Sequence, residues 1–384
     1  MGDCFTERCE SMPDGELISV TINDGIKKFS ELGRHDNSND DKSKYKKVCA
    51  GDIAYNSMRM WQGASGCSPY EGIVSPAYTV LTPNSGINSK CMAYQFKLPA
   101  TIHTFKINSQ GITSDNWNLK FPALSEIEIY VSPYEQEQAK IAAYFANLDH
   151  LITLHQRKYD KLQVLKKAML EKMFPKNGSS VPEIRFKGFT DAWEQRKLGE
   201  VVERITRKNE NLESTLPLTI SAQYGLINQN EFFDKRIASK DVSGYFLVRN
   251  GEFAYNKSTS SDAPWGAIKR LDRYESGVLS TLYIVFKILD ERKTSSDYIV
   301  TYYNTDLWHK GIQAIAAEGA RNHGLLNVAP ADFFETNLTM PKNYAEQQQI
   351  GSFFQQLDHL ITLHQRELEK LQNIKKSMLE KMFV

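Results

Sequence analysis

The residue types that could do chemistry in this 384-residue chain are not spaced as catalytic or cofactor sites require. The sequence has no GxxxxGK[ST] phosphate loop, no GxGxxG dinucleotide motif and no GxSxG nucleophile motif. It also has no Pro-Pro pair, which excludes the Asn/Asp-Pro-Pro-aromatic tetrad of an amino-methyltransferase. We therefore predict that the chain is not an enzyme by itself.

The histidines and cysteines do not have the spacing of a metal site. His150 and His155 are five residues apart, and so are His359 and His364, whereas two ligands on one helix face are four apart. We expect His155 and His364 to be polar groups that fix the register of two packed helices. The five cysteines, all before residue 92, form no CxxC pair, which is typical of reduced thiols in the cytoplasm.

The composition indicates a globular protein, and the net charge does not by itself indicate DNA binding. The chain is 41% hydrophobic and 24% charged, with a formal charge of +1. Proteins that hold DNA by charge alone are strongly basic, so DNA binding would need locally gathered basic residues or a partner. No apolar run approaches the ~20 residues of a membrane span, and the N-terminus lacks a signal-peptide core. We expect a cytoplasmic protein.

The longest elements in the chain are two copies of one sequence. Residues 141–174 match residues 350–383 at an offset of 209 residues, with 23 of 34 positions identical. The stretch LDHLITLHQR is the same in both copies. Apolar residues recur at helical spacing, and the interiors lack Gly and Pro apart from Gly351. We predict two long helices that pack against each other.

Polar residues recur in the two copies as well, although packing of the pair requires only apolar volume at the seam. We interpret them as two copies of one surface that meet the same partner; recent duplication with little divergence is the alternative. The predicted partner-binding residues are Asp149, His150, Gln156, Arg157, Lys166, Lys167, Asp358, His359, Gln365, Arg366, Lys375 and Lys376.

A mixed segment precedes each helix, and the two segments are distant copies. GDIAYN at residues 51–56 corresponds to GEFAYN at residues 251–256. Runs of β-branched and aromatic residues predict strands at Leu17–Ile22, Ala77–Leu81, Ala93–Leu98, Glu126–Val131, Leu216–Ser221, Thr281–Ile288 and Tyr298–Tyr303.

The predicted fold class is α+β, with two mixed α/β domains joined by two long antiparallel helices in a pseudo-two-fold repeat. The predicted boundaries are domain 1 at 1–133, the first helix at 134–174, a linker at 175–183, domain 2 at 184–340 and the second helix at 341–384. Domain 1 begins at Met1-Gly2-Asp3, which matches only the end of the run that leads into domain 2. We expect that roughly 20 residues of the first repeat are missing or that the natural start lies upstream.

These features together resemble the specificity subunit of Type I restriction–modification enzymes. The resemblance rests on the twin LDHLITLHQR…KLQ…KK…MLEKMF helices, the Glu-Gln pairs at 137–138 and 346–347, and the run PEIRFKGFTDAWEQRKLGEV at 182–201. It covers essentially the whole chain and departs from the family pattern at the N-terminus.

The resemblance implies that each mixed domain is a target recognition domain for one half of a split, non-palindromic DNA site. The helices would set the gap between the halves and bind two modification subunits, which hold S-adenosylmethionine and methylate adenine. Two restriction subunits that use ATP and magnesium would complete the complex, and this subunit would hold no cofactor. A coiled-coil scaffold whose end domains bind protein or glycan is the alternative.

The residues that would contact DNA are predicted from the chemistry of base and phosphate recognition, which favours Arg, Lys, Asn, Gln and small hydroxyls. The two loops that follow the GDIAYN and GEFAYN segments are the main candidates. In domain 1 the predicted residues are Lys27, Lys28, Asn56, Ser57, Arg59, Trp61, Gln62 and Ser65. In domain 2 they are Arg204, Arg207, Lys208, Lys257, Ser258, Thr259, Arg321, Asn322 and His323.

Overall fold

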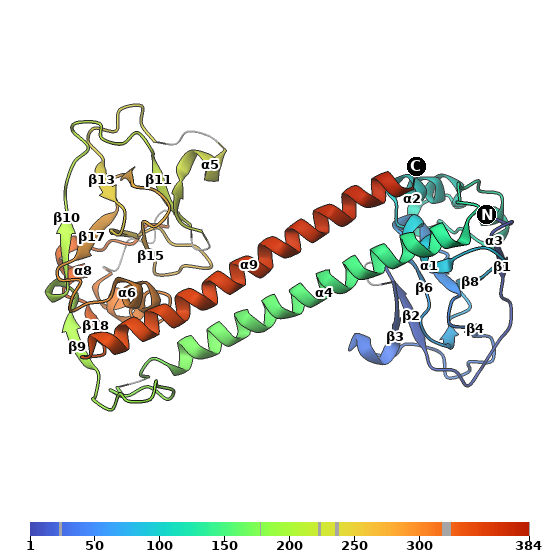
Figure 1. The fold of residues 1–384 in the computed structure, drawn as a ribbon, viewed down its shortest axis with the longest axis horizontal. Coiled ribbons are helices and arrows are strands. Elements are labelled where there is room, and N and C mark those ends of the chain that lie inside the picture. The colour runs from blue at the N-terminus through green and yellow to red at the C-terminus, as the bar shows by residue number, and fades with distance from the viewer. Residues whose placement is uncertain (23–24, 177, 222–223, 235–237, 317–323, 384) are drawn as a thin grey trace. The chain divides into compact units, whose positions relative to one another are not determined.

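A computed structural model describes residues 1–383 apart from 23–24, 177, 222–223, 235–237 and 317–323. The chain divides into two compact units, here called unit 1 and unit 2. Unit 1 comprises Met1–Arg157 with His364–Val384, and unit 2 comprises Lys158–Leu363. Each unit therefore contains one mixed domain and a segment of each long helix (Figure 1).

The two long helices are α4 (Glu135–Lys172) and α9 (Tyr344–Met382), which confirms the helices predicted from the repeat. Each has at least one acidic residue in its first turn and a lysine in its last turn, an arrangement that the helix dipole favours. Gly351 allows α9 to approach the domain closely, because a Cβ at this position would lie 2.6 Å from the Cβ of Asp297. Close packing against the domain therefore explains why Gly351, a poor helix former, occurs near the start of α9.

Within unit 1, α4 and α9 lie side by side and run in opposite directions (Figure 1). The Nδ1 atoms of His155 and His364 are 3.1 Å apart, so one ring donates a hydrogen bond and the other accepts it. Earlier in α4, Asp149 pairs with Lys375 at 2.5 Å, further along α9. The two histidines therefore meet between the helices as hydrogen-bonded polar groups, as predicted, and their role in fixing the register stays a prediction.

Unit 2 repeats these contacts between the equivalent residues. Lys166 in α4 pairs with Asp358 in α9 at 2.5 Å, and this is the Asp149–Lys375 pair displaced by 209 residues. The aromatic contacts recur in the same way: Phe145 and Phe383 stack in unit 1, and Phe174 and Phe354 meet in unit 2. The internal repeat of the sequence is therefore also a repeat of side-chain contacts.

The strands repeat in the same order. In unit 1 they are β1 (Phe5–Glu7), β2 (Ile18–Thr21), β3 (Gly25–Lys28), β4 (Lys46–Val48), β5 (Ile53–Asn56), β6 (Ser65–Cys67), β7 (Gly72–Val74) and β8 (Tyr78–Pro83). In unit 2 they are β9 (Glu194–Lys197), β10 (Val202–Ile205), β11 (Leu218–Ser221), β12 (Gly225–Asn228), β13 (Phe246–Arg249), β14 (Phe253–Asn256), β15 (Ala267–Arg270), β16 (Ser276–Leu279), β17 (Ile284–Ile288) and β18 (Asn337–Met340).

Each unit has a four-stranded antiparallel sheet with matching topology. The order is β1-β8-β5-β6 in unit 1 and β10-β17-β14-β15 in unit 2. Two-stranded sheets correspond as well, β2-β3 with β11-β12 and β4-β7 with β13-β16. The exception is the β9-β18 pair of unit 2, for which the described part of unit 1 has no equivalent.

Both faces of each four-stranded sheet are buried. In β5, Ile53 and Tyr55 belong to a hydrophobic cluster with the short helices, whereas Ala54 belongs to a second cluster with β2, β4 and β7. Phe253 and Ala254 in β14 divide between two clusters in the same way. Because both faces are packed, each sheet holds the loops at its ends in position, and such loops commonly carry the binding residues of a protein.

Short helices complete the units. They are α1 (Ser89–Gln95), α2 (Pro99–Asn108) and α3 (Phe121–Ser125) in unit 1, and α5 (Gln229–Phe233), α6 (Ser296–Tyr302), α7 (His309–Ile315) and α8 (Pro330–Phe334) in unit 2. The 3-10 helices are η1 (Phe29–Leu32), η2 (Met60–Gln62), η3 (Ser114–Asn116) and η4 (Leu198–Glu200).

Two predicted strands are wrong because their residues form helices. The run at Ala93–Leu98 overlaps α1, and the run at Tyr298–Tyr303 overlaps α6. Each helix begins with a side-chain cap, in which Asn88 or Ser295 accepts a hydrogen bond from a backbone N–H in the first turn. The aromatic residues that suggested a strand in α6 instead fill the core.

The strand predicted at Glu126–Val131 is also wrong, since no strand is formed there. A strand needs a hydrogen-bonding neighbour, and the equivalent strand of unit 2, β18, has one in β9. The remaining predicted strands are confirmed as β2, β8, β11 and β17.

A buried glutamine near the start of each long helix connects it to its domain. In unit 1, Gln138 accepts a hydrogen bond from the Asn88 N–H at 2.8 Å and donates to the carbonyls of Gly86 and Ser132. In unit 2, Gln347 makes the same three bonds, with the Ser295 N–H, at 2.9 Å, and two carbonyls. Each helix is thus fixed to the loop before α1 or α6.

Candidate nucleic-acid interface

The loop after β5 in unit 1 presents a basic and aromatic surface. Asn56 begins it by accepting a hydrogen bond from the Met58 N–H at 3.1 Å, and Gly63 closes it with a φ of 83°. Arg59 is exposed, and its guanidinium donates to the Gln62 side chain at 3.2 Å. The loop therefore holds a cation and an amide close together at the end of a buried strand.

Two residues that the sequence analysis missed extend this surface. The rings of Trp61 and Trp117 pack edge to face, with centroids 5.2 Å apart. The ammonium group of Lys106 lies 5.6 Å from the centroid of Trp117. The Trp117 and Lys106 side chains come from segments about 50 residues away along the chain, so spacing alone gave no signal for them. Aromatic rings beside cations are typical of surfaces that bind nucleic acid.

Two of the predicted serines in unit 1 face the interior. The Ser57 hydroxyl is buried and hydrogen-bonded to the Thr79 hydroxyl at 2.8 Å. Ser65 is completely buried in β6. Neither side chain is available to a ligand in this structure, so we leave both residues out of the candidate surface.

The two lysines predicted on β3 are only half-buried and lie near the loop. A Cβ on Gly66 of β6 would come within 3.0 Å of the Ile26 backbone, so β3 packs directly on the strand that follows the loop. Lys28 is engaged, with an ion pair to Glu16 at 2.9 Å and its ammonium 5.3 Å from the Tyr70 ring.

The equivalent loop of unit 2 begins in the same way but continues differently. Asn256 accepts a hydrogen bond from the Ser258 N–H at 3.0 Å, as Asn56 does in unit 1. Lys257 turns toward the protein and donates to the Val328 carbonyl at 3.5 Å, and burial lowers the pKa of its ammonium group. The Thr259 hydroxyl donates a hydrogen bond to the Gly324 carbonyl. Of the predicted residues Lys257, Ser258 and Thr259, only Ser258 is exposed.

Arg207 has a structural role that the sequence analysis did not identify. Its guanidinium donates to both carboxylate oxygens of Glu252, at 2.8 and 3.0 Å. In unit 1, Arg8 pairs with the equivalent carboxylate of Asp52, donating from Nε at 2.8 Å and from Nη2 at 3.1 Å, whereas Arg207 donates to both oxygens from Nη2. Because the pair recurs in both units and its carboxylates are buried, we assign Arg207 to the fold and remove it from the candidate surface.

The other basic residues predicted in unit 2 differ in their exposure. Arg204 is exposed on β10. Lys208 donates to the Gly244 carbonyl at 2.9 Å and lies 4.3 Å from the centroid of the Phe246 ring. Arg321, Asn322 and His323 lie outside the described residues.

The predicted partner surface on the helices divides into two groups. Asp149, Lys166, Asp358 and Lys375 form the two helix-to-helix ion pairs, so helix pairing accounts for their recurrence. Gln156 and Gln365 are half-buried. The residues that remain exposed are His150, Arg157, Lys167, His359, Arg366 and Lys376.

Exposed leucines accompany these polar residues in both helices. Leu151 and Leu154 are 39% and 37% exposed, and their repeats Leu360 and Leu363 are 40% and 44% exposed. The exposed parts of these leucines are apolar surface that the contact between α4 and α9 leaves uncovered. The exposed and repeated part of the helices is therefore both apolar and basic.

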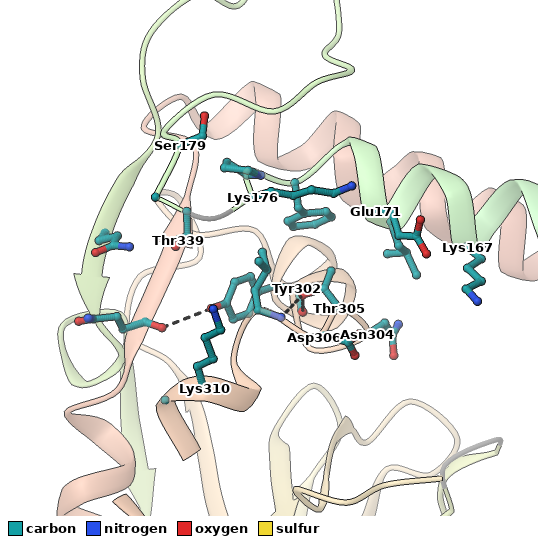
Figure 2. Close-up of a pocket in the computed structure, with 18 residues that line it drawn as sticks. Lys167, Glu171, Lys176, Ser179, Tyr302, Asn304, Thr305, Asp306, Lys310 and Thr339 are labelled. Carbon is teal, nitrogen blue, oxygen red and sulfur yellow. Dashed lines mark hydrogen bonds between the residues drawn. The ribbon is translucent and has the colours of Figure 1, made fainter. Parts of the chain in front are cut away.

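A cavity in unit 2 has a volume of about 720 Å³ and lies beside the end of α4 (Figure 2). Lys167 and Glu171 of α4 line it with Tyr302, Thr305 and Lys310 of the domain. Charged groups of both signs line it.

Two further findings concern the described part of the chain. No group of three or more His, Cys, Asp or Glu residues there is arranged to hold a metal ion. None of its helices is both long enough and apolar enough to cross a membrane.

A segment within the first half of the chain matches a known family model. The family model described as Type I restriction modification DNA specificity domain matches residues 22–164. A comparison with curated proteins gave no match.

Solved structures of S subunits are similar over the full length. The S subunit of a Type I restriction–modification system from M. genitalium is 13% identical with a TM-score of 0.59, and the match covers 100% of this chain and 94% of that one. The HsdS subunit from Thermoanaerobacter tengcongensis is 15% identical with a TM-score of 0.45, covering 100% and 95%. Residues 22–164 therefore match the model of a Type I restriction modification DNA specificity domain, and the chain over its whole length is similar in fold to a Type I S subunit.

Proposed function

We propose that this chain is the DNA-recognition subunit of a Type I restriction–modification complex and acts without catalytic groups of its own. The observation that carries the proposal is the DNA specificity domain at residues 22–164 within a chain that repeats the same domain topology. Each domain would bind one half of a split DNA site in the cytoplasm.

The loops after β5 and β14 present different side chains, which supports a DNA site with two unlike halves. Both begin with the same Asn turn, but the first presents Arg59 and Trp61 whereas the second presents Ser258. Base edges are distinguished by the donors and acceptors of such side chains, so different loops select different bases. We therefore propose that the complete site is non-palindromic.

The helices would bind two modification subunits through their repeated exposed residues. In unit 1 this surface includes His150, Arg157 and the leucines at 151 and 154. An apolar patch beside basic residues is the composition of a protein-binding surface, because the apolar part supplies affinity and the charges supply orientation. The modification subunits would supply S-adenosylmethionine, and two restriction subunits would supply ATP-dependent chemistry with magnesium.

The proposal is tested by mapping methylated adenines in cells that carry this chain with its modification subunits. A single two-part motif of two unlike half-sites with a fixed gap is expected, and it should vanish when this chain is omitted. In vitro, binding of the assembled complex to DNA should weaken steeply between 50 and 200 mM salt, on the order of 10³-fold or more. Methylation without a two-part motif, or binding that is insensitive to salt, would contradict the proposal and favour the scaffold alternative.

A further inference from the structure

A lysine between α1 and α2 holds the end of the loop that follows β5 in unit 1. This loop, residues 57–64, and its equivalent after β14, residues 257–266, are here called the recognition loops. The Lys97 ammonium group donates a hydrogen bond to the Gly63 carbonyl at 2.5 Å and another to the Ile22 carbonyl at 2.9 Å. Gly63 lies in the last turn of the loop, where its φ is 83°. A charged donor therefore fixes the point at which the loop returns to the sheet.

A lysine connects the same two segments in unit 2, with the donor and acceptor positions exchanged. Lys269 lies on β15, the strand directly after the recognition loop, and its ammonium group donates to the side-chain carbonyl of Asn304 at 2.9 Å. Asn304 is the repeat of Lys97, because each directly follows the C-cap of its helix, which is Phe96 after α1 and Tyr303 after α6. In both units, the segment after this helix is therefore bound to the end of the loop.

The two lysines are not repeats of each other. Lys269 pairs with Ala254 across the sheet, and the equivalent partner of Ala54 in unit 1 is Gly66. A Cβ on Gly66 would lie 3.0 Å from the backbone nitrogen of Ile26, so a longer side chain there would push against β3. Since different positions supply the lysine in the two units, duplication of the sequence alone does not account for the shared contact.

Each lysine also lies beside the ion pair between α4 and α9 in its unit. In unit 1, Lys97 lines a cavity of about 610 Å³ together with Asp149, the carboxylate of that pair. In unit 2, burial and the nearby Lys166 lower the pKa of the Lys269 ammonium group, and Asp358 opposes this shift. The end of each recognition loop is thus bound at a part of the domain that packs on the long helices.

We propose that Lys97 and Lys269 are positioning residues for base recognition, each of which holds the end of its recognition loop and so fixes the side chains that select bases. The inference rests on the proposed function, because it requires these loops to contact DNA. A loop that is held before DNA binds loses less conformational entropy on binding and presents one arrangement of its side chains. Such a loop cannot move to accommodate a wrong base.

The test measures base discrimination by the complex assembled with its modification subunits. Methylation rates are compared between the preferred site and single-base variants of each half-site. Lys97→Met keeps a side chain of similar length without its donors, so discrimination in one half-site should fall about tenfold while the other half-site is unchanged. Lys269→Met should have the same effect on the other half-site. A loss of stability alone would lower methylation of all sites alike, without this separation.

Two further variants separate positioning of the loop from loss of charge. Lys97→Arg should keep discrimination within about threefold of the unsubstituted protein, because a guanidinium can donate to both carbonyls. Lys90→Met removes the same charge from another side chain of the same cavity and should leave discrimination unchanged. Amide hydrogen exchange of the chain without DNA should accelerate at residues 57–64 in Lys97→Met and not in Lys90→Met.

Three results would overturn the inference: unchanged discrimination in both methionine variants of the positioning lysines, an equal loss in the two half-sites, or unchanged hydrogen exchange at residues 57–64 in Lys97→Met. A failure of the proposed function is distinguishable from these, because the unsubstituted complex would then show no two-part motif.

Discussion

At the scale of residues, repetition of contacts separates side chains that hold the fold from those that are free to bind. Arg8–Asp52 and Arg207–Glu252 are the same pair in two units, although Arg207 was predicted to contact DNA. The sequence could not reveal this, because each arginine lies more than 40 residues from its carboxylate. Arg59, by contrast, is exposed on the first loop, and its contact with DNA stays a prediction.

Substitution of the structural arginines should reduce stability and leave site preference unchanged. Arg8→Ala and Arg207→Ala each leave a buried carboxylate without its cation, which should lower the free energy of unfolding by about 3 kcal/mol. Denaturant unfolding checks the first effect and mapping of methylated adenines the second. A changed motif with Arg207→Ala would return this residue to the DNA surface.

Arg59→Ala should have the reverse effects: stability should stay nearly unchanged and site preference should change. The side chain is exposed, so stability should change by less than about 0.5 kcal/mol. Discrimination at one base position should fall by about 1–3 kcal/mol if the guanidinium contacts a base. Relative methylation of single-base variants of the site measures this, with Arg292→Ala, a 90% exposed arginine of unit 2, as the control. Equal site preference in Arg59→Ala and the unsubstituted protein would rule out the contact.

The cysteines should differ in reactivity according to burial. Burial raises the pKa of the Cys91 thiol to about 11, so only about one thiol in a thousand is ionised at pH 8. The exposed Cys9 should therefore react with iodoacetamide first, and labelling of Cys91 should accelerate as the pH rises toward 11. Mass spectrometry of labelled peptides measures the order, and denatured protein serves as the control. Equally fast labelling of both thiols in the folded protein would contradict the assigned burial.

At the scale of elements, the long helices were predictable and the short ones were not. Repeated letters and helical spacing identified α4 and α9 from sequence. The runs at α1 and α6 were mistaken for strands because aromatic and β-branched residues favour both strands and buried helices. Their capping residues, Asn88 and Ser295, were the available local signal.

Substitution of the buried glutamines Gln138 and Gln347 should lower stability by similar amounts in the two units. Gln138→Leu and Gln347→Leu each leave a backbone N–H and two carbonyls without partners, which should cost about 3 kcal/mol. Hydrogen exchange should accelerate at the start of α1 in the first variant and at the start of α6 in the second. Loss of protection in neither helix would show that these bonds do not fix the long helices to their domains.

At the scale of the whole molecule, the repeated order of domain and helix was predictable from sequence, but the surfaces that would bind DNA were predicted only in part. The loop after β5 was predicted, whereas Trp117 and Lys106 were not, because tertiary packing brings them to Trp61. The proposed role of the helices as a spacer makes a prediction about the DNA gap.

The central claim, that two domains on a helical spacer bind two half-sites, is tested by lengthening both helices together. Seven residues inserted after Arg157 in α4 and seven after Leu363 in α9 would keep the helices paired, because His155 faces His364 beside these points. The insertion adds about 10 Å to each helix, or about three base pairs at 3.4 Å each. Methylated adenines mapped in cells should show both half-sites unchanged and the gap longer by about three base pairs. An active variant with an unchanged gap, or with altered half-sites, would contradict the account.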